Sequence, residues 1–203
     1  MKKLALAAMI GMISASAFAA QGDILARFRV INVDPSASWS NSGAVAGLNV
    51  DAKAATVPEL DFTYMITNNI GAELILGTSR HKITANGADI GKVSVLPPTL
   101  TLQYHFAPEA TFRPYVGAGI NYTRFYDTGL NALGTNISVK QNSWGGALQV
   151  GADVAINKDW FVNFDVKKLW ISTDVTADQL GGAKLGTLDV NPWVFGLGIG
   201  TKF

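Results

Sequence analysis

His81 and His105 are the two histidines of the 203-residue chain, and imidazole is the side chain best suited to move protons near neutral pH. His105 shares its strand face with carboxylates, but no serine falls on that face at a comparable depth. His81 follows Ser79 at the start of a long polar segment, where we expect a solvated loop histidine. The sequence has no cysteine, and neither a metal-ligand cluster nor a paired nucleophile and base emerges from it. We therefore predict no enzyme and no cofactor or metal site.

Most other charged residues alternate with apolar ones, a period of two that is typical of β-strands. The charges gather on one strand face and leave the other apolar, as with Phe195, Leu197 and Ile199. A charge in lipid near the membrane centre would cost roughly 2–4 kcal/mol, so this sorting predicts a closed barrel with a polar interior. The predicted polar floor of the lumen comprises Arg27, Arg29, Glu59, Asp61, Glu73, Gln103, His105, Asp153, Asp165, Lys167 and Lys202.

The C-terminal segment, Trp193–Phe203, alternates apolar residues with glycines and has an aromatic residue at each end. At about 3.3 Å per residue, its ten steps give a length of roughly 33 Å. Tilted by about 45°, such a strand covers roughly 23 Å, close to the 25 Å apolar band of an outer-membrane barrel. Eight strands are predicted in this way: Asp23–Val33, Val57–Ile66, Gly71–Arg80, Thr99–Phe106, Phe112–Tyr126, Ser143–Ile156, Trp160–Thr173 and Leu188–Phe203.

Short and long links alternate between these strands. Three are tight turns rich in Asn, Pro and Asp, namely Thr67–Ile70, Ala107–Thr111 and Asn157–Asp159. Four are long and rich in Gly, Ser, Asn or Asp, namely Asp34–Thr56, His81–Pro98, Asp127–Asn142 and Asp174–Thr187. We therefore predict an all-β fold, an eight-stranded antiparallel transmembrane β-barrel with short periplasmic turns, long extracellular loops and both termini in the periplasm.

Aromatic residues recur at a spacing of ten on three of the predicted strands, which places both members of a pair on one face. Aromatic rings favour the two membrane interfaces, so these pairs predict two girdles. The girdle residues are Phe112, Tyr122, Trp160, Trp170, Trp193 and Phe203. Lys168 breaks the pattern, because its parity points it toward lipid beside Trp170. Either it reaches outward to lipopolysaccharide phosphates or a bulge turns it inward.

The inward parity also includes apolar side chains and many glycines. An eight-stranded barrel is just wide enough to be filled by its own side chains. Glycines on three strands either leave room for a narrow path or relieve strain where the wall curves tightly. The predicted lumen lining comprises Ile75, Tyr115, Gly117, Gly119, Gly151, Gly196, Gly198 and Gly200.

The N-terminal residues 1–19 have the three parts of a secretory signal peptide. Lys2 and Lys3 precede an apolar run, which ends in small residues with Ala17 and Ala19 at the predicted cleavage site. Cleavage would change the formal net charge from +1 to −1, because it removes two lysines and no acidic residue. We therefore predict a signal peptide over residues 1–19 and a barrel over residues 20–203. The near-neutral charge gives no indication of nucleic-acid binding.

Several stretches of the chain share a pattern with a known family, namely Leu96–Leu100, Gln103–Tyr104, Arg113–Thr123, Ser143–Gly145, Asp159–Trp160, and Pro192–Phe195 with the terminal Phe203. Together they resemble the OmpW family of small outer-membrane barrels. The resemblance covers nearly the whole chain after residue 19. It implies an eight-stranded barrel that passes small, mostly hydrophobic molecules inward across the outer membrane, with a largely apolar lumen and an exit through the barrel wall. Lys167 and Lys168 depart from this pattern, because bulkier uncharged residues are expected there.

The leading hypothesis is a passive channel for apolar solutes. A solute would enter through a loop mouth made by Trp39, Leu48, Val50, Leu96 and Leu130. The charged floor would stop it, because desolvating paired charges is costly. Pro97 and Pro98 cannot donate ladder hydrogen bonds, so we predict a weak lateral seam at that point.

The alternative hypothesis is a non-conducting structural barrel that serves as a surface receptor for phage or bacteriocin. Its lumen charges would then simply pair with one another. For either function, the expected partners are outer-membrane lipid and lipopolysaccharide, together with the barrel-assembly machinery, which would bind the C-terminal strand ending in Phe203. Small hydrophobic solutes are partners of the channel alone.

Overall fold

The computed structural model describes residues 20–43, 47–132 and 134–203. The predicted signal peptide lies outside these residues and stays a prediction. Eight long antiparallel strands form a closed barrel, because each pairs with the next barrel strand along the chain and the first also pairs with the last. The barrel strands are β1 (Ile24–Asp34), β4 (Ala55–Met65), β5 (Ile70–Gly77), β8 (Thr99–His105), β9 (Phe112–Ala132), β11 (Asn142–Ala155), β12 (Trp160–Leu169) and β15 (Trp193–Lys202). The predicted fold class is confirmed.

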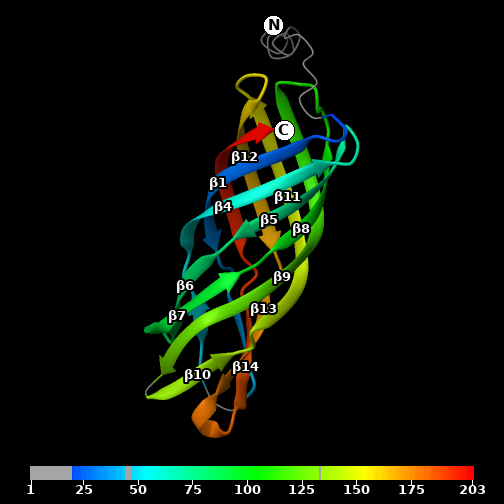
Figure 1. The fold of residues 1–203 in the computed structure, drawn as a ribbon. Coiled ribbons are helices and arrows are strands. Elements are labelled where there is room, and N and C mark those ends of the chain that lie inside the picture. Colours follow the sequence, from blue (N-terminus) through cyan, green and yellow to red (C-terminus); the bar gives the residue numbers. More distant parts are fainter. Residues whose placement is uncertain (1–19, 44–46, 133) are drawn as a thin grey trace, which may run out of the picture.

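The three short turns lie at one end of the barrel, here called the turn end, with the C-terminus beside them (Figure 1). Local hydrogen bonds explain two of these turns. The Thr67 hydroxyl accepts from the amides of Asn69 and Ile70, and the Asn157 side-chain oxygen accepts from those of Asp159 and Trp160. Such side-chain bonds compete with strand pairing, so the chain reverses at these points.

The opposite end, here called the loop end, differs from the prediction. The four long segments expected to be loops are largely strands that continue the wall past the barrel (Figure 1). These are β2 (Ser38–Asn41), β3 (Val50–Ala52), β6 (Ser79–Ala85), β7 (Ala88–Leu96), β10 (Thr135–Val139), β13 (Ser172–Ala177) and β14 (Ala183–Asp189), with a 3-10 turn at Asp178–Leu180.

A tight hairpin joins β6 to β7 through Asn86 and Gly87, both with positive φ. Asn-Gly is the typical sequence of such a two-residue turn. The signal was therefore present in the sequence, within a segment whose polar composition favoured a loop. The Gly71–Arg80 strand is also interrupted, because β5 ends at Gly77 and β6 begins at Ser79.

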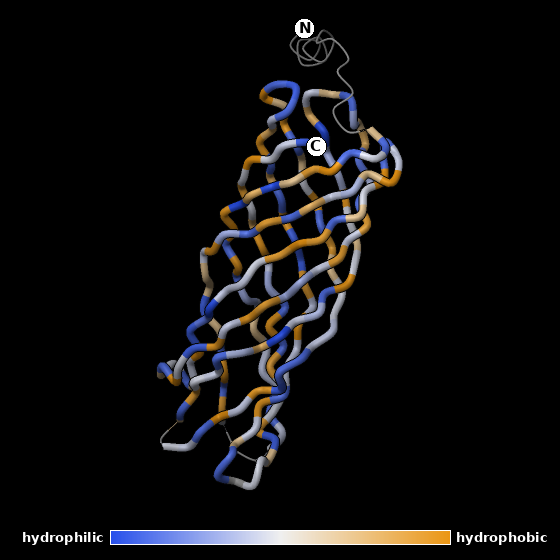
Figure 2. Tube along the Cα trace, in the orientation of Figure 1, coloured by the Kyte–Doolittle hydropathy of each residue, from blue (hydrophilic) through white to orange (hydrophobic). Residues whose placement is uncertain are grey.

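Hydrophobic and hydrophilic residues alternate along the barrel strands, as the colours in Figure 2 show. The exposed, outward-facing residues are the apolar ones, such as Leu100, Leu102 and Leu197. Phe112, Trp160 and Phe203 are exposed near the turn end. Trp193, Trp170 and Tyr122 face outward at the other rim of the barrel, where Tyr122 packs against Trp144 with ring centroids 4.9 Å apart. This is the two-girdle arrangement expected from the spacing of ten.

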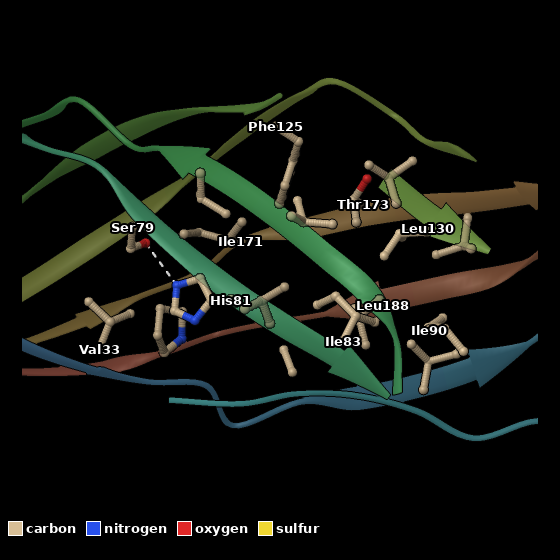
Figure 3. Close-up of a pocket in the computed structure, with 18 of the residues that line it drawn as sticks. Val33, Ser79, His81, Ile83, Ile90, Phe125, Leu130, Ile171, Thr173 and Leu188 are labelled. Carbon is tan, nitrogen blue, oxygen red and sulfur yellow. Dashed lines mark hydrogen bonds between the residues drawn. The ribbon is translucent and has the colours of Figure 1, made fainter. Parts of the chain in front are cut away.

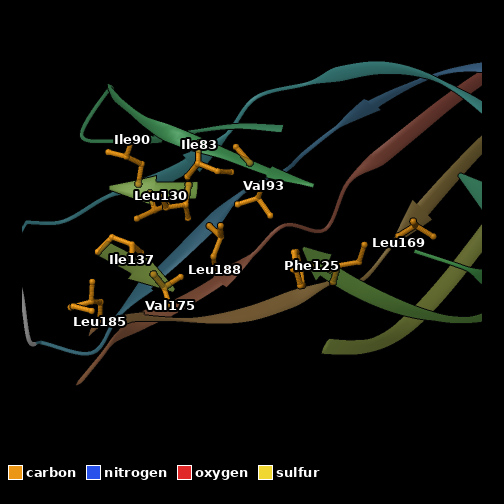
Figure 4. Close-up of a cluster of buried hydrophobic side chains, with 14 of the residues drawn as sticks. Ile83, Ile90, Val93, Phe125, Leu130, Ile137, Leu169, Val175, Leu185 and Leu188 are labelled. Carbon is orange, nitrogen blue, oxygen red and sulfur yellow. The ribbon is translucent and has the colours of Figure 1, made fainter. Parts of the chain in front are cut away.

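The interior has three layers along the barrel axis. Leu25, Met65 and Phe161 form a small apolar cluster near the turn end. Charged side chains occupy the middle, and a larger apolar cluster lies inside the loop end (Figure 4). In the part of the chain that the structure describes, no helix is long and apolar enough to cross a membrane.

Candidate functional site

Two arginines of β1 organise the charged middle layer, here called the plug. Arg27 donates to both carboxylate oxygens of Asp153, at 3.1 and 2.8 Å, and to Asp61 at 2.9 Å. The guanidinium also donates to the Thr63 hydroxyl at 2.7 Å. Arg27 and Asp61 are cross-strand partners, so the register of β1 and β4 brings this ion pair together.

Arg29 lies two residues further along the same face and binds a second set of acceptors. It donates to Glu59 at 2.8 Å, to Glu73 at 3.1 Å and to the Asn163 side-chain oxygen at 2.7 Å. Because strands on both sides of β1 supply these acceptors, the two arginines tie the barrel across its lumen. Buried charges persist when they are paired and hydrogen-bonded in this way.

Lys167 extends the plug from β12 and faces the loop end. Its ammonium lies 2.7 Å from Glu59 and 2.8 Å from Asp165. Asp165 also accepts from the Tyr115 hydroxyl at 2.8 Å and from the Gln149 amide at 2.7 Å. Ten of the eleven predicted floor residues therefore lie in the plug. His105 belongs to it through a hydrogen bond to Gln103 at 3.1 Å.

Lys202 is the exception, and its placement in the floor was wrong. Its ammonium lies 3.5 Å from Asp23 at the turn-end rim, and both side chains are about a quarter exposed. The parity assigned to Lys202 was right, since it pairs with the inward-facing Leu25. Parity fixes the face of a strand but not the depth of a residue along the barrel.

The inward glycines do not leave an open path, which corrects one of the two predicted roles. A Cβ added at Gly198 would overlap Arg29 and the Phe28 carbonyl, and one added at Gly200 or Gly151 would overlap the rings of Phe161 or Tyr115. The glycines therefore make room for large side chains reaching in from other strands. Gly119 has another role, because the backbone of β8 lies against its Cα.

An apolar chamber of about 590 Å³ lies above the plug, inside the loop end (Figure 3). Glu59 and Lys167 form its floor, and its wall is mostly aliphatic, with Phe125, Ile171 and Leu188 among the lining residues. This volume lies within the range of small-molecule sites. Strands β6, β7 and β13, which were expected to be loops, supply much of the wall.

The predicted mouth residues divide into three groups. Leu48, Val50 and Leu130 line the chamber. Trp39 packs against the apolar cluster around the chamber but does not line the cavity. Leu96 was misplaced, because it points outward and is 38% exposed while its neighbour Val95 faces the chamber.

His81 was expected to be a solvated loop residue, and this was wrong. It is 5% exposed, lines the chamber and makes two hydrogen bonds at 2.8 Å, one between Nε2 and Ser79 Oγ and one between Nδ1 and the Lys53 carbonyl. Burial lowers the pKa of His81 below its ordinary value, and the bond to the carbonyl opposes this only partly. The loop composition concealed that Ser79, His81 and Ile83 share the inner face of a strand.

The wall beside the chamber contains a break in strand pairing, here called the seam. The β5–β8 ladder ends at the pair Ile75 and Thr99, and the β6–β7 ladder begins at Ser79 and Val95. Leu76–Thr78 and Leu96–Pro98 lie opposite each other between these two ladders. Within the described strands, no backbone pairing joins these two segments. Pro97 and Pro98 have no amide hydrogen to donate, which accounts for the break. Gly77, Thr78 and Pro97 line the chamber at this point.

Lys168 faces outward, which decides between the two orientations left open. It pairs with the outward-facing Trp193, and its ammonium lies 4.9 Å from the centre of the Trp193 ring. The ammonium also donates to the Asn191 carbonyl at 2.5 Å. Lys167 points into the lumen on regular β12, so no bulge turns the two lysines to the same side.

A closed eight-stranded barrel with an apolar outer belt, two aromatic girdles and charges inside defines an outer-membrane β-barrel protein. The chain belongs to the OmpW family, whose sequence model matches residues 20–203. It is 43% identical over 217 residues to outer membrane protein W of Escherichia coli K12, with all of both chains covered. These relationships place it in the outer membrane of a Gram-negative bacterium.

Two further relatives are informative. The crystal structure of the outer membrane protein OprG from Pseudomonas aeruginosa superposes with a TM-score of 0.83 at 31% identity, covering 93% of this chain and 99% of OprG. The dibenzothiophene metabolism operon protein PahQ, also from P. aeruginosa, is 30% identical over 173 residues, covering 81% of this chain and 80% of PahQ.

Proposed function

We propose that this protein is a passive outer-membrane channel for small hydrophobic molecules, which leave its lumen sideways into the membrane. One arrangement carries the proposal: an apolar chamber ends on a plug of buried ion pairs and has a break in its wall just above that plug.

The chamber favours apolar solutes at its extracellular side. Leu48, Val50 and Leu130 line its outer part, and aliphatic side chains continue to the floor. Transfer of an apolar molecule from water into such a space is favourable by about 25 cal/mol per Å² of apolar surface removed from water. The name of PahQ, which refers to the metabolism of an aromatic sulfur heterocycle, agrees with a solute of this kind.

The plug blocks further movement along the axis. Glu59 and Lys167 at the chamber floor are almost fully buried, and the Glu59 carboxylate binds both Lys167 and Arg29. An apolar solute cannot replace these ion pairs, and separating them would leave uncompensated buried charges. The seam is the remaining apolar way out. Its outer face carries Leu76 and Leu96, which continue the lipid-facing surface.

Uptake of naphthalene by reconstituted vesicles tests the proposal. The vesicles need an outer leaflet of lipopolysaccharide, because a simple phospholipid bilayer already passes apolar molecules. We expect naphthalene to enter protein-containing vesicles several times faster than empty ones, whereas sucrose enters both equally slowly. Equal naphthalene rates with and without the protein would refute the channel.

The plug also supports a second candidate, a non-conducting barrel that serves as a surface receptor for phage or bacteriocin. Its paired charges fill the lumen, so ionic conductance is expected to be absent under both functions. A deletion strain separates them. Loss of phage adsorption with unchanged naphthalene uptake favours the receptor, and slowed uptake favours the channel.

A further inference from the structure

Ser79 and His81 form a hydrogen-bonded unit whose proton positions follow from its partners. The Lys53 carbonyl can only accept, so Nδ1 of His81 carries the ring hydrogen. In the neutral ring, Nε2 is then an acceptor, and the Ser79 hydroxyl must donate its hydrogen to it across 2.8 Å. Burial lowers the pKa of His81 and so favours the neutral ring.

This arrangement leaves Ser79 Oγ with lone pairs and no hydrogen to offer. Two bonds in series, from Ser79 to His81 and from His81 to Lys53, polarise each other and make Oγ a stronger acceptor. Among the residues that the structure describes, no other group is bonded to this oxygen. The unit can therefore accept a hydrogen bond from a ligand but cannot donate one.

The surroundings of the unit are hydrocarbon. Val33 and Ile83 lie beside it on the chamber wall (Figure 3). Two other hydroxyls of the wall, on Thr99 and Thr173, donate to the backbone carbonyls of Pro97 and Lys140 at 2.9 and 2.8 Å. Each of these carbonyl bonds is isolated and lacks the second bond that polarises Ser79. An O–H group brought in beside the unit loses its water, which costs about 1–3 kcal/mol if no new acceptor replaces it. The Glu59 carboxylate at the chamber floor is already bound to Arg29 and Lys167.

The position of Ser79 relates the unit to the exit. Ser79 and Val95 are the first paired residues above the seam, and Thr78 and Gly77 below them line the same chamber. A ligand whose hydroxyl is bound to Ser79 thus has its apolar part beside the break in the wall. The seam lies at the level of the girdle residue Tyr122, whose amide donates to the Pro98 carbonyl at 3.0 Å.

We infer that Ser79 and His81 form an anchor for apolar molecules that carry one hydroxyl group, such as alkylphenols and long-chain alcohols. The anchor names a substrate class for the proposed channel, so it rests on the proposed function. Ethers and ketones of the same size are disfavoured, because they present lone pairs to an acceptor. Hydrocarbons pass without a bond at this point.

Binding of three matched probes tests the anchor: 4-hexylphenol, 4-hexylanisole and hexylbenzene. The protein is extracted from outer membranes, placed in lipid nanodiscs and titrated while the Ile83 methyl resonance is followed, since Ile83 lines the chamber beside His81. We expect 4-hexylphenol to bind about tenfold more tightly than 4-hexylanisole. It should also shift the ring nitrogen resonances of His81, and hexylbenzene should not.

Ser79→Ala removes this acceptor with little change in shape, and it is made together with His81→Phe, because the alanine alone would uncover Nε2 of His81 as another acceptor. The change should weaken binding of 4-hexylphenol about fivefold to tenfold and binding of hexylbenzene less than twofold. The matched control is Thr173→Val, which removes another hydroxyl of the same chamber and should affect both probes equally. Equal losses for both probes in this double variant, or no preference for the phenol in the wild type, would overturn the anchor.

The two proposals fail separately. If the phenol preference depends on Ser79 but vesicles take up no apolar probe, the channel is refuted and the anchor stands. If vesicles take up all three probes and the double variant alters none of the relative affinities, the anchor is refuted and the channel stands.

Discussion

The Thr78 hydroxyl lies 2.6 Å from the phenolic oxygen of Tyr126, and this hydrogen bond crosses the outer face of the seam. Thr78 belongs to the link between β5 and β6, whereas Tyr126 belongs to β9, the strand that pairs with both β7 and β8. Thr78 also donates to the Val95 carbonyl at 3.2 Å. Where backbone pairing is missing, these side-chain bonds hold the two sides of the seam together.

Replacing Tyr126 with Phe should therefore loosen the seam. One hydrogen bond contributes about 0.5–1.5 kcal/mol, so an open seam should become about twofold to tenfold more populated. We expect naphthalene uptake to quicken by a factor in this range if release limits transport. Tyr122→Phe is the control, because the Tyr122 hydroxyl also bonds outside the barrel, to Asn142 at 2.6 Å, but away from the seam. Equal rates in the two variants would contradict a role for Tyr126 in closing the seam.

A disulfide across the seam should have the opposite effect. The two ladders share one register, so Thr78 and Leu96 face each other across the break, and both are exposed on the outer face. The chain has no cysteine, so the variant Thr78→Cys/Leu96→Cys forms a single defined bridge. Oxidation should slow naphthalene uptake to the rate of vesicles without protein, and reduction should restore the faster rate.

The pair Leu74→Cys/Leu100→Cys is the control for that disulfide. These residues join the same two sides of the wall, β5 and β8, at a point where the ladder is intact. A bridge there adds the same chemistry without closing a gap, so uptake should not change on oxidation. If both bridges block uptake, the solute leaves by another route or the barrel must flex as a whole.

The barrel could be predicted from the sequence because lipid and lumen impose opposite requirements on alternate residues. Arg27 and Arg29 on β1, facing Asp61 and Glu59 on β4, show this sorting directly. The loop end was mispredicted because its strands do not face lipid. Polar residues such as Lys82 and Asp89 there are free to lie on the outer face, which hides the alternation.

The chamber was the part of the site that sequence could least anticipate. Val93, Leu130 and Leu185 come from three separate predicted loops and meet only after those segments pair. Ser79 and His81 are two residues apart. On a strand this spacing places both side chains on one face, whereas in a loop it does not determine where they point. The Asn86-Gly87 turn was the signal that identifies this segment as a hairpin.

Removal of Arg29 tests whether the plug stabilises the barrel. Arg29→Met keeps much of the side-chain volume but removes the arginine that binds both Glu59 and Glu73. Of the described cations, Glu59 then keeps only Lys167, and the nearest one to Glu73 is Arg27 at 3.7 Å. Breaking a buried ion pair on one side costs about 3–5 kcal/mol, so urea unfolding in lipid vesicles should shift by this amount. Arg80→Met is the control, because the Arg80 and Asp127 side chains are 55% exposed and such surface pairs contribute about 0–1 kcal/mol. Similar shifts in both variants would mean that Glu59 and Glu73 find other partners.

Substitutions at the glycines of β15 test whether their space is filled by neighbouring atoms or forms an open path through the lumen. Gly196 and Gly198 share the inner face of one strand, yet a Cβ at Gly198 would collide with the Phe28 carbonyl and Arg29. A Cβ at Gly196 would meet the side-chain atoms of Arg29 and Ile31 at 3.2 and 3.3 Å, which small shifts can relieve. Gly198→Ala should therefore lower the free energy of unfolding by about 1–3 kcal/mol, and Gly196→Ala by clearly less. If instead both alanines leave stability unchanged and slow naphthalene uptake, the glycines line an open path and the plug does not fill the lumen.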